Sequence, residues 1–321
     1  MNHSTCKTVL TAILSLAVSF TSMAQGKFVP FKYGNFDTRV TRQIHEAAVT
    51  GGPTKTLYEI GPNRSLSGNN PYTNLGGSPW GTSNVMAKVS GITKTNNSVY
   101  RDNHASGHCA KMTTHIETCK VLGLINIKVL AAGSIFLGDM KEPITGTKDG
   151  PKALNFGIPF THRPKALRYD YKVQVPGTPN RIRQTGFSKV TTVPGPDYCI
   201  AMLLLQKRHE DANGNITAQR VGTVVVKYGK STGGWVEDAT YEIHYGNITG
   251  KSFYNAATMG LRSHDYARNS KGKSVLVKET GWAPADATPT HIVLQFSSSH
   301  GGAYVGTVGN TFWVDNVGLV Y

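Results

Sequence analysis

Residues Leu154–Gly177 read LNFGIPFTHRPKALRYDYKVQVPG, and this stretch decides the fold class. From Leu167 to Val175 apolar and polar residues alternate, a period of two that is typical of a half-buried strand. The Arg163–Pro164 step keeps the chain extended before this strand, because the proline ring disfavours helix at the preceding residue. Pro176–Gly177 predicts a turn after it. The polar face of the predicted strand consists of Arg168, Asp170, Lys172 and Gln174.

The remainder of the chain repeats this pattern in short stretches, and roughly ten strands are predicted in all. Asn213–Gly214 is a strong hairpin signal because both residues accept positive φ, so residues 198–227 are expected to form antiparallel neighbours. Up to about Tyr100 the sequence is rich in Gly, Asn, Ser, Thr and Pro, which predicts long loops and short edge strands. Residues 254–262 suggest one short helix. The pattern indicates an all-β sandwich or jelly roll.

The first 24 residues have the parts of a secretory signal peptide. A basic region contains Lys7, an apolar run extends from Val9 to Phe20, and Ser22-Met23-Ala24 is a small-x-small cleavage signal. The apolar run is too short to cross roughly 30 Å of hydrocarbon, and no later segment is long enough. We therefore expect a signal peptide over residues 1–24, a single domain over residues 25–321, and a protein secreted to the periplasm or the outer cell surface.

Charge is lopsided, with 34 Lys and Arg against 19 Asp and Glu. The net charge of +15 falls to +14 without the leader, whose one charged residue is Lys7. Such a surface attracts polyanions, which for an exported protein are acidic glycans, anionic lipid headgroups or, as the weakest alternative, nucleic acid. Lysines that keep an all-β surface soluble and guard its edges would give the same composition. No nucleic-acid partner is predicted, because the sequence contains no basic run or nucleic-acid motif.

Cysteine is sparse after the leader. Cys109, Cys119 and Cys199 are an odd number, so at most one disulfide can form. Cys109 and Cys119 lie ten residues apart, which leaves a bridge between them open. Cys199 lies in an apolar run and is expected to be a small buried hydrophobic residue without a partner.

The stretch quoted first also resembles the hallmark of a known family, in its Asn155-Phe156-Gly157-x-Pro159-Phe160, its Arg-Pro step and its alternating strand ending in Pro-Gly. The likeness extends to Ala131–Gly138, to His291–Tyr321 and to Gly34-Asn35-Phe36-Asp37. In these parts the chain resembles the putative carbohydrate metabolism domain, found in secreted proteins of Gram-negative gut-type bacteria. The resemblance implies a jelly-roll β-sandwich of two antiparallel sheets, related to carbohydrate-binding modules. It implies no particular reaction.

Asp315 needs a partner, because alternation along the last strand places it on one face with Trp313, Val317 and Leu319. An unpaired carboxylate there would be costly. Similar carbohydrate-binding jelly rolls hold a structural calcium between this aspartate and an early acidic residue. The resemblance therefore implies calcium at Asp37 and Asp315, with oxygen ligands at about 2.3–2.6 Å. A salt bridge or backbone N–H groups would serve Asp315 equally well, and Asp37 stands where that motif commonly has the longer glutamate.

Sugar recognition uses an aromatic ring against the apolar face of the pyranose, with polar side chains bonded to the hydroxyls. Candidate ligand contacts in loop-like contexts are Trp80, Trp282 and Tyr304. Trp235 and Trp313 lie in predicted strands and are expected to belong to the core.

A glycosidase would require two carboxylates about 5.5 Å apart for retention, or 6.5–9.5 Å apart for inversion. Glu237, Asp238 and Glu242 are the candidate catalytic acids, because they fall on one predicted strand. A zinc site is a weaker hypothesis, since histidines close in sequence but without a fitting carboxylate are common by chance. The histidines in question are His104, His108 and His115.

Three functions follow from these observations. The first is a secreted glycan-binding protein that takes part in polysaccharide capture or metabolism at the cell surface. The second is a glycoside hydrolase on the same scaffold, and the third is a structural or adhesive surface protein without a small ligand. An aromatic strip without an acid pair would indicate the binding protein. A cleft with two facing carboxylates would indicate the enzyme.

Overall fold

The computed structural model describes residues 26–321 except 90, 122–124, 147 and 188, so the expected signal peptide lies outside the described residues. Within them the chain is almost entirely β, which confirms the predicted fold class. The short helix expected near residue 256 is α2 (Ala256–Met259), where the Asn255 side chain accepts a hydrogen bond from the Ala257 N–H. The described residues also contain α1 (Gly150–Ala153) and one 3-10 turn (Ala48–Thr50). None of the helices in this part of the chain is long and apolar enough to cross a membrane.

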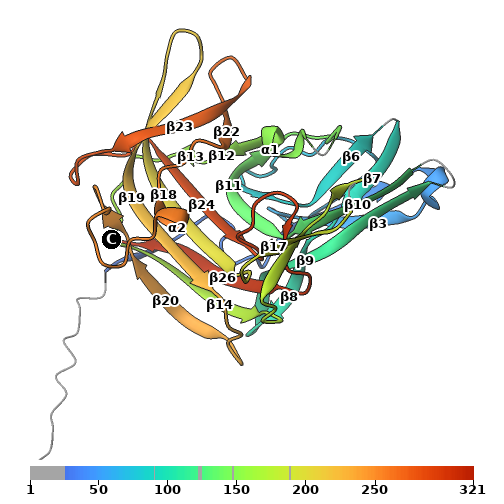
Figure 1. Cartoon of the computed structure of the whole chain (residues 1–321), viewed down its shortest axis with the longest axis horizontal. Helices are drawn as coiled ribbons and strands as arrows, with labels where there is room; N and C mark the ends of the chain where they lie inside the picture. The colour runs from blue at the N-terminus through green and yellow to red at the C-terminus, as the bar shows by residue number, and fades with distance from the viewer. Residues whose placement is uncertain (1–25, 90, 122–124, 147, 188) are drawn as a thin grey trace, which may run out of the picture.

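Two large sheets form the body of the molecule (Figure 1). The first sheet runs in the order β16 (Thr185–Gly186), β10 (Ile125–Ala132), β9 (Gly107–Val121), β26 (Thr311–Val320), β14 (Ala166–Gln174) and β20 (Val236–Glu242). Two more strands extend it, β1 (Phe28–Pro30) beside β26 and β8 (Val99–His104) beside β9. The strand predicted from the opening stretch is therefore β14, and it lies between β26 and β20.

The second sheet faces the first. Its order is β12 (Leu154–Phe156), β11 (Ser134–Met140), β24 (His291–Ser297), β18 (Cys199–Glu210), β19 (Ile216–Tyr228), β23 (Ser274–Trp282) and β22 (Asp265–Arg268). Shorter strands join its sides, namely β13 (Ile158–Pro159), β21 (His244–Tyr245) and β5 (Trp80–Thr82). The predicted hairpin is confirmed, because β18 and β19 pair antiparallel around the Asn-Gly turn. β19 and β23 pair in parallel, in contrast to the antiparallel pattern of the other pairs in this sheet.

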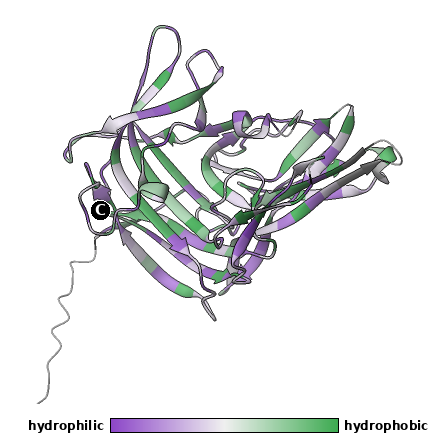
Figure 2. Cartoon of the chain, viewed as in Figure 1, coloured by the Kyte–Doolittle hydropathy of each residue, from purple (hydrophilic) through white to green (hydrophobic). Residues whose placement is uncertain are grey.

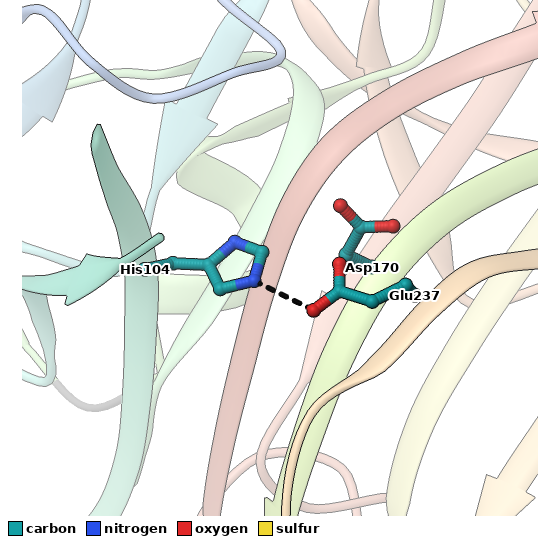
Figure 3. Close-up of side chains that lie close together, drawn as sticks. All are labelled: His104, Asp170 and Glu237. Atoms are coloured by element: carbon teal, nitrogen blue, oxygen red, sulfur yellow. Dashed lines mark hydrogen bonds and ion pairs between the residues drawn. The ribbon is translucent and has the colours of Figure 1, made fainter. Parts of the chain in front are cut away.

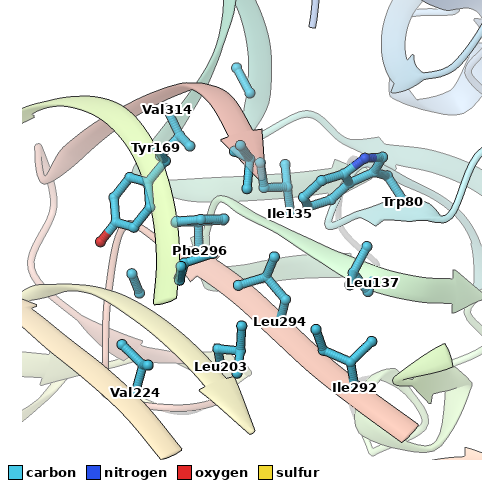
Figure 4. Packing of buried hydrophobic residues seen from close by; sticks show 14 of the residues in the cluster. Trp80, Ile135, Leu137, Tyr169, Leu203, Val224, Ile292, Leu294, Phe296 and Val314 are labelled. Carbon is cyan, nitrogen blue, oxygen red and sulfur yellow. The ribbon is translucent and has the colours of Figure 1, made fainter. Parts of the chain in front are cut away.

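The main core fills the space between the two sheets, and both sheets contribute side chains to it (Figure 4). Tyr169 of β14 is fully buried and meets Phe296 of β24 edge to face, with ring centroids 4.8 Å apart. Its hydroxyl is bonded to that of Tyr228, which donates in turn to Tyr241 at 2.9 Å. Hydrophobic and hydrophilic positions alternate along many strands, as Figure 2 shows. Each large apolar side chain buried in this way contributes about 1.5–3 kcal/mol.

The N-terminal region is more regular than the predicted long loops. It contains β2 (Arg39–His45), β3 (Thr54–Ile60), β4 (Arg64–Ser67), β6 (Val85–Val89) and β7 (Ile92–Asn96), in two small sheets. A third small sheet consists of β15 (Asn180–Arg183), β17 (Thr191–Pro194) and β25 (Val305–Gly306). In β2 the buried residues are Val40, Arg42 and Ile44. A buried arginine interrupts the apolar alternation, which is why the sequence pattern there is weak.

Cys109 and Cys199 are isolated thiols. Cys199 is free and fully buried, which confirms the prediction, and burial raises the pKa of its thiol well above the usual range. Cys109 is also free and buried. Cys109 and Cys119 both belong to β9, where ten residues span about 34 Å. A disulfide requires Cα atoms within about 7 Å, so these two residues cannot be bridged.

Candidate functional site

A β-bulge interrupts the pairing of β14 with β26. The register passes from Arg168 opposite Gly318 to Asp170 opposite Asp315, so β26 holds one residue more than β14 over this interval. The backbone of Asn316 takes the left-handed conformation there, with φ of 49°. Asn tolerates this region better than most residues other than glycine. Bulges of this kind often redirect side chains next to functional sites.

A second bulge lies at the same level on the other side of β14. Between β14 and β20 the register passes from Tyr169 opposite Ala239 to Tyr171 opposite Val236, so β20 also holds one extra residue. Asp238 has φ of 52°. The middle of β14 is therefore flanked by two bulges, each with an Asn or Asp in the left-handed region.

The bulge at Asn316 changes the direction in which Asp315 points. Val314 and Val317 both belong to the main core, so the alternation changes phase between them. Asp315 and Trp313 consequently lie on the face of β26 that is turned away from the core. The predicted alignment of Asp315 with Val317 is wrong, because a strict period of two does not account for an inserted residue.

Asp170 lies between the two bulges and is 4% exposed. Its carboxylate accepts a hydrogen bond from the Asp238 backbone N–H at 2.6 Å and one from the Asn316 side-chain amide at 2.7 Å. Each bulge thus supplies one donor. A residue that the alternating pattern places on a polar, exposed face is in fact buried and held in one orientation.

His104, at the end of β8, contacts two further acids, Asp315 and Glu237; Figure 3 shows its contact with Glu237. Its Nδ1 lies 2.6 Å from Oδ2 of Asp315, and its Nε2 lies 3.1 Å from Oε1 of Glu237. The imidazole stacks on Trp235, with ring centroids 3.7 Å apart and planes at 23°. Asp315 therefore pairs with an imidazole, which corresponds to the salt bridge that the sequence left open as an alternative to calcium. We name His104, Asp170, Glu237 and Asp315 the bulge cluster.

The bulge cluster shifts the pKa values of two of its members, Asp315 and His104. Burial raises the pKa of Asp315 to about 6 against the opposing effect of His104, and the charge of Asp170 adds to the rise. Burial lowers the pKa of His104, but its hydrogen bonds to Asp315 and Glu237 outweigh this and raise it overall. Three carboxylates therefore surround one imidazole, and the cluster is short of positive charge.

A row of aromatic and charged side chains continues from the bulge cluster across the same face. Lys172 lies 5.6 Å from the centroid of the Trp235 ring and 4.3 Å from that of Trp313. On its other side Trp313 has Lys111 at 5.4 Å, and its indole N–H donates to Asp102 at 2.9 Å. We name these five residues the aromatic strip. Trp235 is half-buried and Trp313 is 7% exposed, so Trp235 is the more accessible ring.

Of the three predicted catalytic acids, the structure brings Glu237 into the bulge cluster, with a side chain that is 58% exposed. Asp238 contributes its backbone N–H to the cluster, while its carboxylate pairs with Arg168 at 3.2 Å. Glu242 is exposed at the end of β20, opposite Ala166, and no described contact joins it to the cluster.

The predicted sugar-stacking residues lie elsewhere. Trp80 is 1% exposed in the main core and donates its indole N–H to the Lys32 carbonyl, so its ring has no face open to a ligand. Trp282 is half-buried, 5.5 Å from the guanidinium of Arg220. Tyr304 is half-buried with φ of 64°. The contacts described for these three residues do not bring them together.

Asp37 and Asp315, the predicted calcium ligands, contact different residues near the β8–β9 turn, His108 and His104 respectively. The Asp37 carboxylate accepts from the His108 N–H at 2.9 Å and from the Asn35 amide at 2.7 Å. Asp315 uses its oxygens for His104 and for the Asn316 N–H at 2.7 Å. Neither carboxylate needs an ion to be satisfied, and a calcium ion between them stays a prediction.

A second group of buried charges lies in the N-terminal region, where Arg42 is shared by Glu59 and Glu142. Glu59 also accepts from the Thr82 hydroxyl at 2.7 Å, and Glu142 from the Tyr72 N–H at 3.0 Å. One guanidinium serves two carboxylates, and burial raises the pKa of Glu59 to about 7, with the charge of Glu142 adding to the rise. All these side chains have protein partners, so we assign this group a role in stability.

This pKa predicts how stability changes with pH. The folded chain holds a proton on Glu59 that the unfolded chain releases near pH 4.5. The contribution of the Glu59 carboxyl to the free energy of unfolding is therefore fully present below about pH 4.5 and is lost as the pH rises through about 7. We expect Glu59→Gln to remove about 2.5 kcal/mol of the fall in unfolding free energy between pH 5 and 8, measured by urea denaturation. Identical pH slopes for the variant and the wild type would contradict this.

Comparison with known proteins places the chain in a family. Residues 58–320 match the family model described as the putative carbohydrate metabolism domain, and no curated protein matches. Among solved structures the chain is similar to the crystal structure of a putative glycoside hydrolase from Bacteroides thetaiotaomicron, with 17% identity, a TM-score of 0.43 and coverage of 84% of this chain and 75% of that one. That likeness is too distant to bear on activity. Because the family match spans most of the sequence and all of the bulge cluster, the chain belongs to the putative carbohydrate metabolism domain family.

Proposed function

We propose that this protein binds carbohydrate along the aromatic strip and the bulge cluster. Its family supports a carbohydrate-related role. The observation that carries the proposal is the half-buried Trp235, whose indole is held flat against His104 and next to Lys172. A fixed indole beside convergent charged groups is the usual composition of a sugar site, since the ring packs on the pyranose and the polar groups bond its hydroxyls.

The charges next to Trp235 suggest the class of glycan. Glu237, whose side chain is 58% exposed, is an acceptor for sugar hydroxyl donors, while the ammonium groups of Lys172 and Lys111 are suited to uronic carboxylates or sulfate groups. A net charge of +15 over the whole chain would attract such polyanions. We therefore propose an acidic glycan as the ligand. We also propose that binding takes place outside the cytoplasm, on the basis of the expected signal peptide.

Trp235→Ala is expected to lower the affinity for the bound glycan by roughly tenfold or more, because a stacked sugar loses its aromatic partner. The measurement is a glycan array of acidic and neutral members, followed by calorimetry on the best ligand. Trp282→Ala is the matched control, since this tryptophan is also half-buried but lies outside the strip. Lys172→Gln should lower the affinity for acidic glycans selectively and make that affinity less dependent on salt concentration. Loss of binding in Trp282→Ala with none in Trp235→Ala would contradict the proposed site.

Glycoside hydrolysis is the second candidate. Asp170 and Asp315 are neighbours across the β14–β26 pair, and the pKa of Asp315 is raised to about 6. Acid and base roles in glycosidases arise where the environment separates the pKa values of two carboxyl groups. Release of reducing ends from the bound glycan, abolished in Asp315→Asn, would favour the enzyme. Binding without any release over a long incubation would favour the binding protein.

A further inference from the structure

We propose that His104, Asp170 and Glu237 bind a divalent transition-metal ion of the zinc type. One ligand atom from each residue, the imidazole nitrogen and two carboxylate oxygens, lies within 4.8 Å of the other two. Figure 3 shows the three side chains converging from β8, β14 and β20. Ligands of tetrahedral zinc lie about 3.4 Å apart, given bonds of about 2.0–2.2 Å. The Glu237 side chain is 58% exposed and can make the small adjustment that closes this set.

Hydrogen bonds from neighbouring residues orient the two buried ligands, His104 and Asp170, as the hydrogen-bond partners of metal ligands do in known sites. Asp315 can only accept a hydrogen bond when ionised, so its 2.6 Å contact with Nδ1 of His104 places the ring proton there. Nε2, which lies 3.1 Å from Oε1 of Glu237, is then the ligand atom, and a metal ion bound there would replace its proton. Ligating histidines almost always donate their second nitrogen to such a carboxylate.

Asp170 is oriented by a comparable arrangement. Donors from Asp238 and Asn316 hold one lone pair on each oxygen and leave the others for a cation. These donors come from the extra residues of the two bulges, so the bulges fix the carboxylate in place. The cluster also has more negative than positive groups, since three carboxylates surround one imidazole. A divalent cation would balance this excess of negative charge.

The residue types identify the class of metal. Calcium prefers six to eight oxygen ligands, whereas one imidazole with two carboxylates suits zinc, manganese, iron or cobalt. The site differs from the predicted calcium site, because Asp315 serves as a partner of His104 instead of a ligand. The exposure of Glu237 leaves room for water at a further position. The proposal does not depend on carbohydrate binding.

Calorimetric titration of metal-stripped protein with zinc sulfate, without any glycan, tests the proposal. We expect one zinc ion per chain, and with cobalt chloride a visible absorption band from a nitrogen- and oxygen-coordinated ion. Glu237→Gln should weaken zinc binding roughly tenfold or more, and His104→Gln should abolish it. Asp315→Asn should weaken it by about 10–100-fold through the outer contact alone.

His115→Gln is the matched control, because His115 lies on β9 of the same sheet and contacts one carboxylate, that of Glu117 at 3.3 Å, where His104 contacts two. Its zinc affinity should equal that of the wild type. The proposal is overturned by a wild type that binds no zinc at 100 μM metal, by equal affinity in Glu237→Gln, or by loss of binding in His115→Gln. Glu237 is exposed, so its variant decides the matter even if His104→Gln does not fold.

Discussion

Arg42→Met is expected to lower the free energy of unfolding by about 3–5 kcal/mol, because it leaves two buried carboxylates without a cation. Arg42 is 2% exposed, and its Nη1 lies 2.8 Å from Glu59 and 3.0 Å from Glu142. Its Nη2 bonds the second oxygen of Glu142 at 2.5 Å. Methionine fills much of the volume but supplies no charge. The measurement is urea denaturation at pH 8, where Glu59 is ionised.

Two further variants separate charge from position. Arg42→Lys keeps the charge but loses the paired bonds to Glu142, so its effect should fall between those of the wild type and Arg42→Met. Arg64→Met changes an exposed arginine on the neighbouring β4 and should stay within about 0.5 kcal/mol of the wild type. An Arg42→Met protein as stable as Arg64→Met would contradict the role of Arg42 as the shared cation.

Arg220→Met, in the second large sheet, is expected to lower the free energy of unfolding by a similar amount, about 3–5 kcal/mol, for the same reason. Arg220 is fully buried, and its Nε lies 2.7 Å from Glu279 while Nη2 bonds the other oxygen. The guanidinium also donates to the carbonyls of Met259 and Gly260, so it joins β19, β23 and the end of α2. Its loss leaves Glu279 buried without a direct ion pair, with hydrogen bonds from Gln206 and the Arg262 N–H and the more distant charges of Arg208 and Arg262.

The double variant Arg220→Met/Glu279→Leu distinguishes a costly orphan charge from a lost favourable interaction. Replacing both members of a buried ion pair by apolar residues is often close to neutral, whereas removing one is strongly destabilising. We therefore expect the double variant to be more stable than Arg220→Met alone, in chemical denaturation. A double variant whose destabilisation equals the sum of those of Arg220→Met and Glu279→Leu would show that the two side chains are not coupled, and would contradict this expectation.

Neither arginine belongs to the candidate site, and this bears on how function and stability can be separated. Arg42 lies in the small sheet of β2, and Arg220 lies on β19 of the second sheet. The bulge cluster belongs to β8, β14, β20 and β26 of the first sheet. Changes at Glu237, which is mostly exposed, should therefore alter binding with little effect on the unfolding free energy.

The sequence alone determined the features that depend on local geometry. The alternation of β14 follows from the period of two that any extended strand imposes on its side chains. The β18–β19 hairpin follows from the positive φ that Asn-Gly accepts. The burial of Cys199 follows from the apolar run around it. Each of these signals extends over a few neighbouring residues, so no knowledge of distant partners was needed.

Tertiary structure alone decided the site. His104 is 211 residues from Asp315 and 133 residues from Glu237 in the sequence, and strand pairing brings them together. The two bulges also arise between strands, because an extra residue exists only relative to a partner strand. They turn Asp315 away from the core and bury Asp170, which on pattern alone is an exposed polar residue. A periodic pattern carries information about one strand, and the chemistry here depends on four.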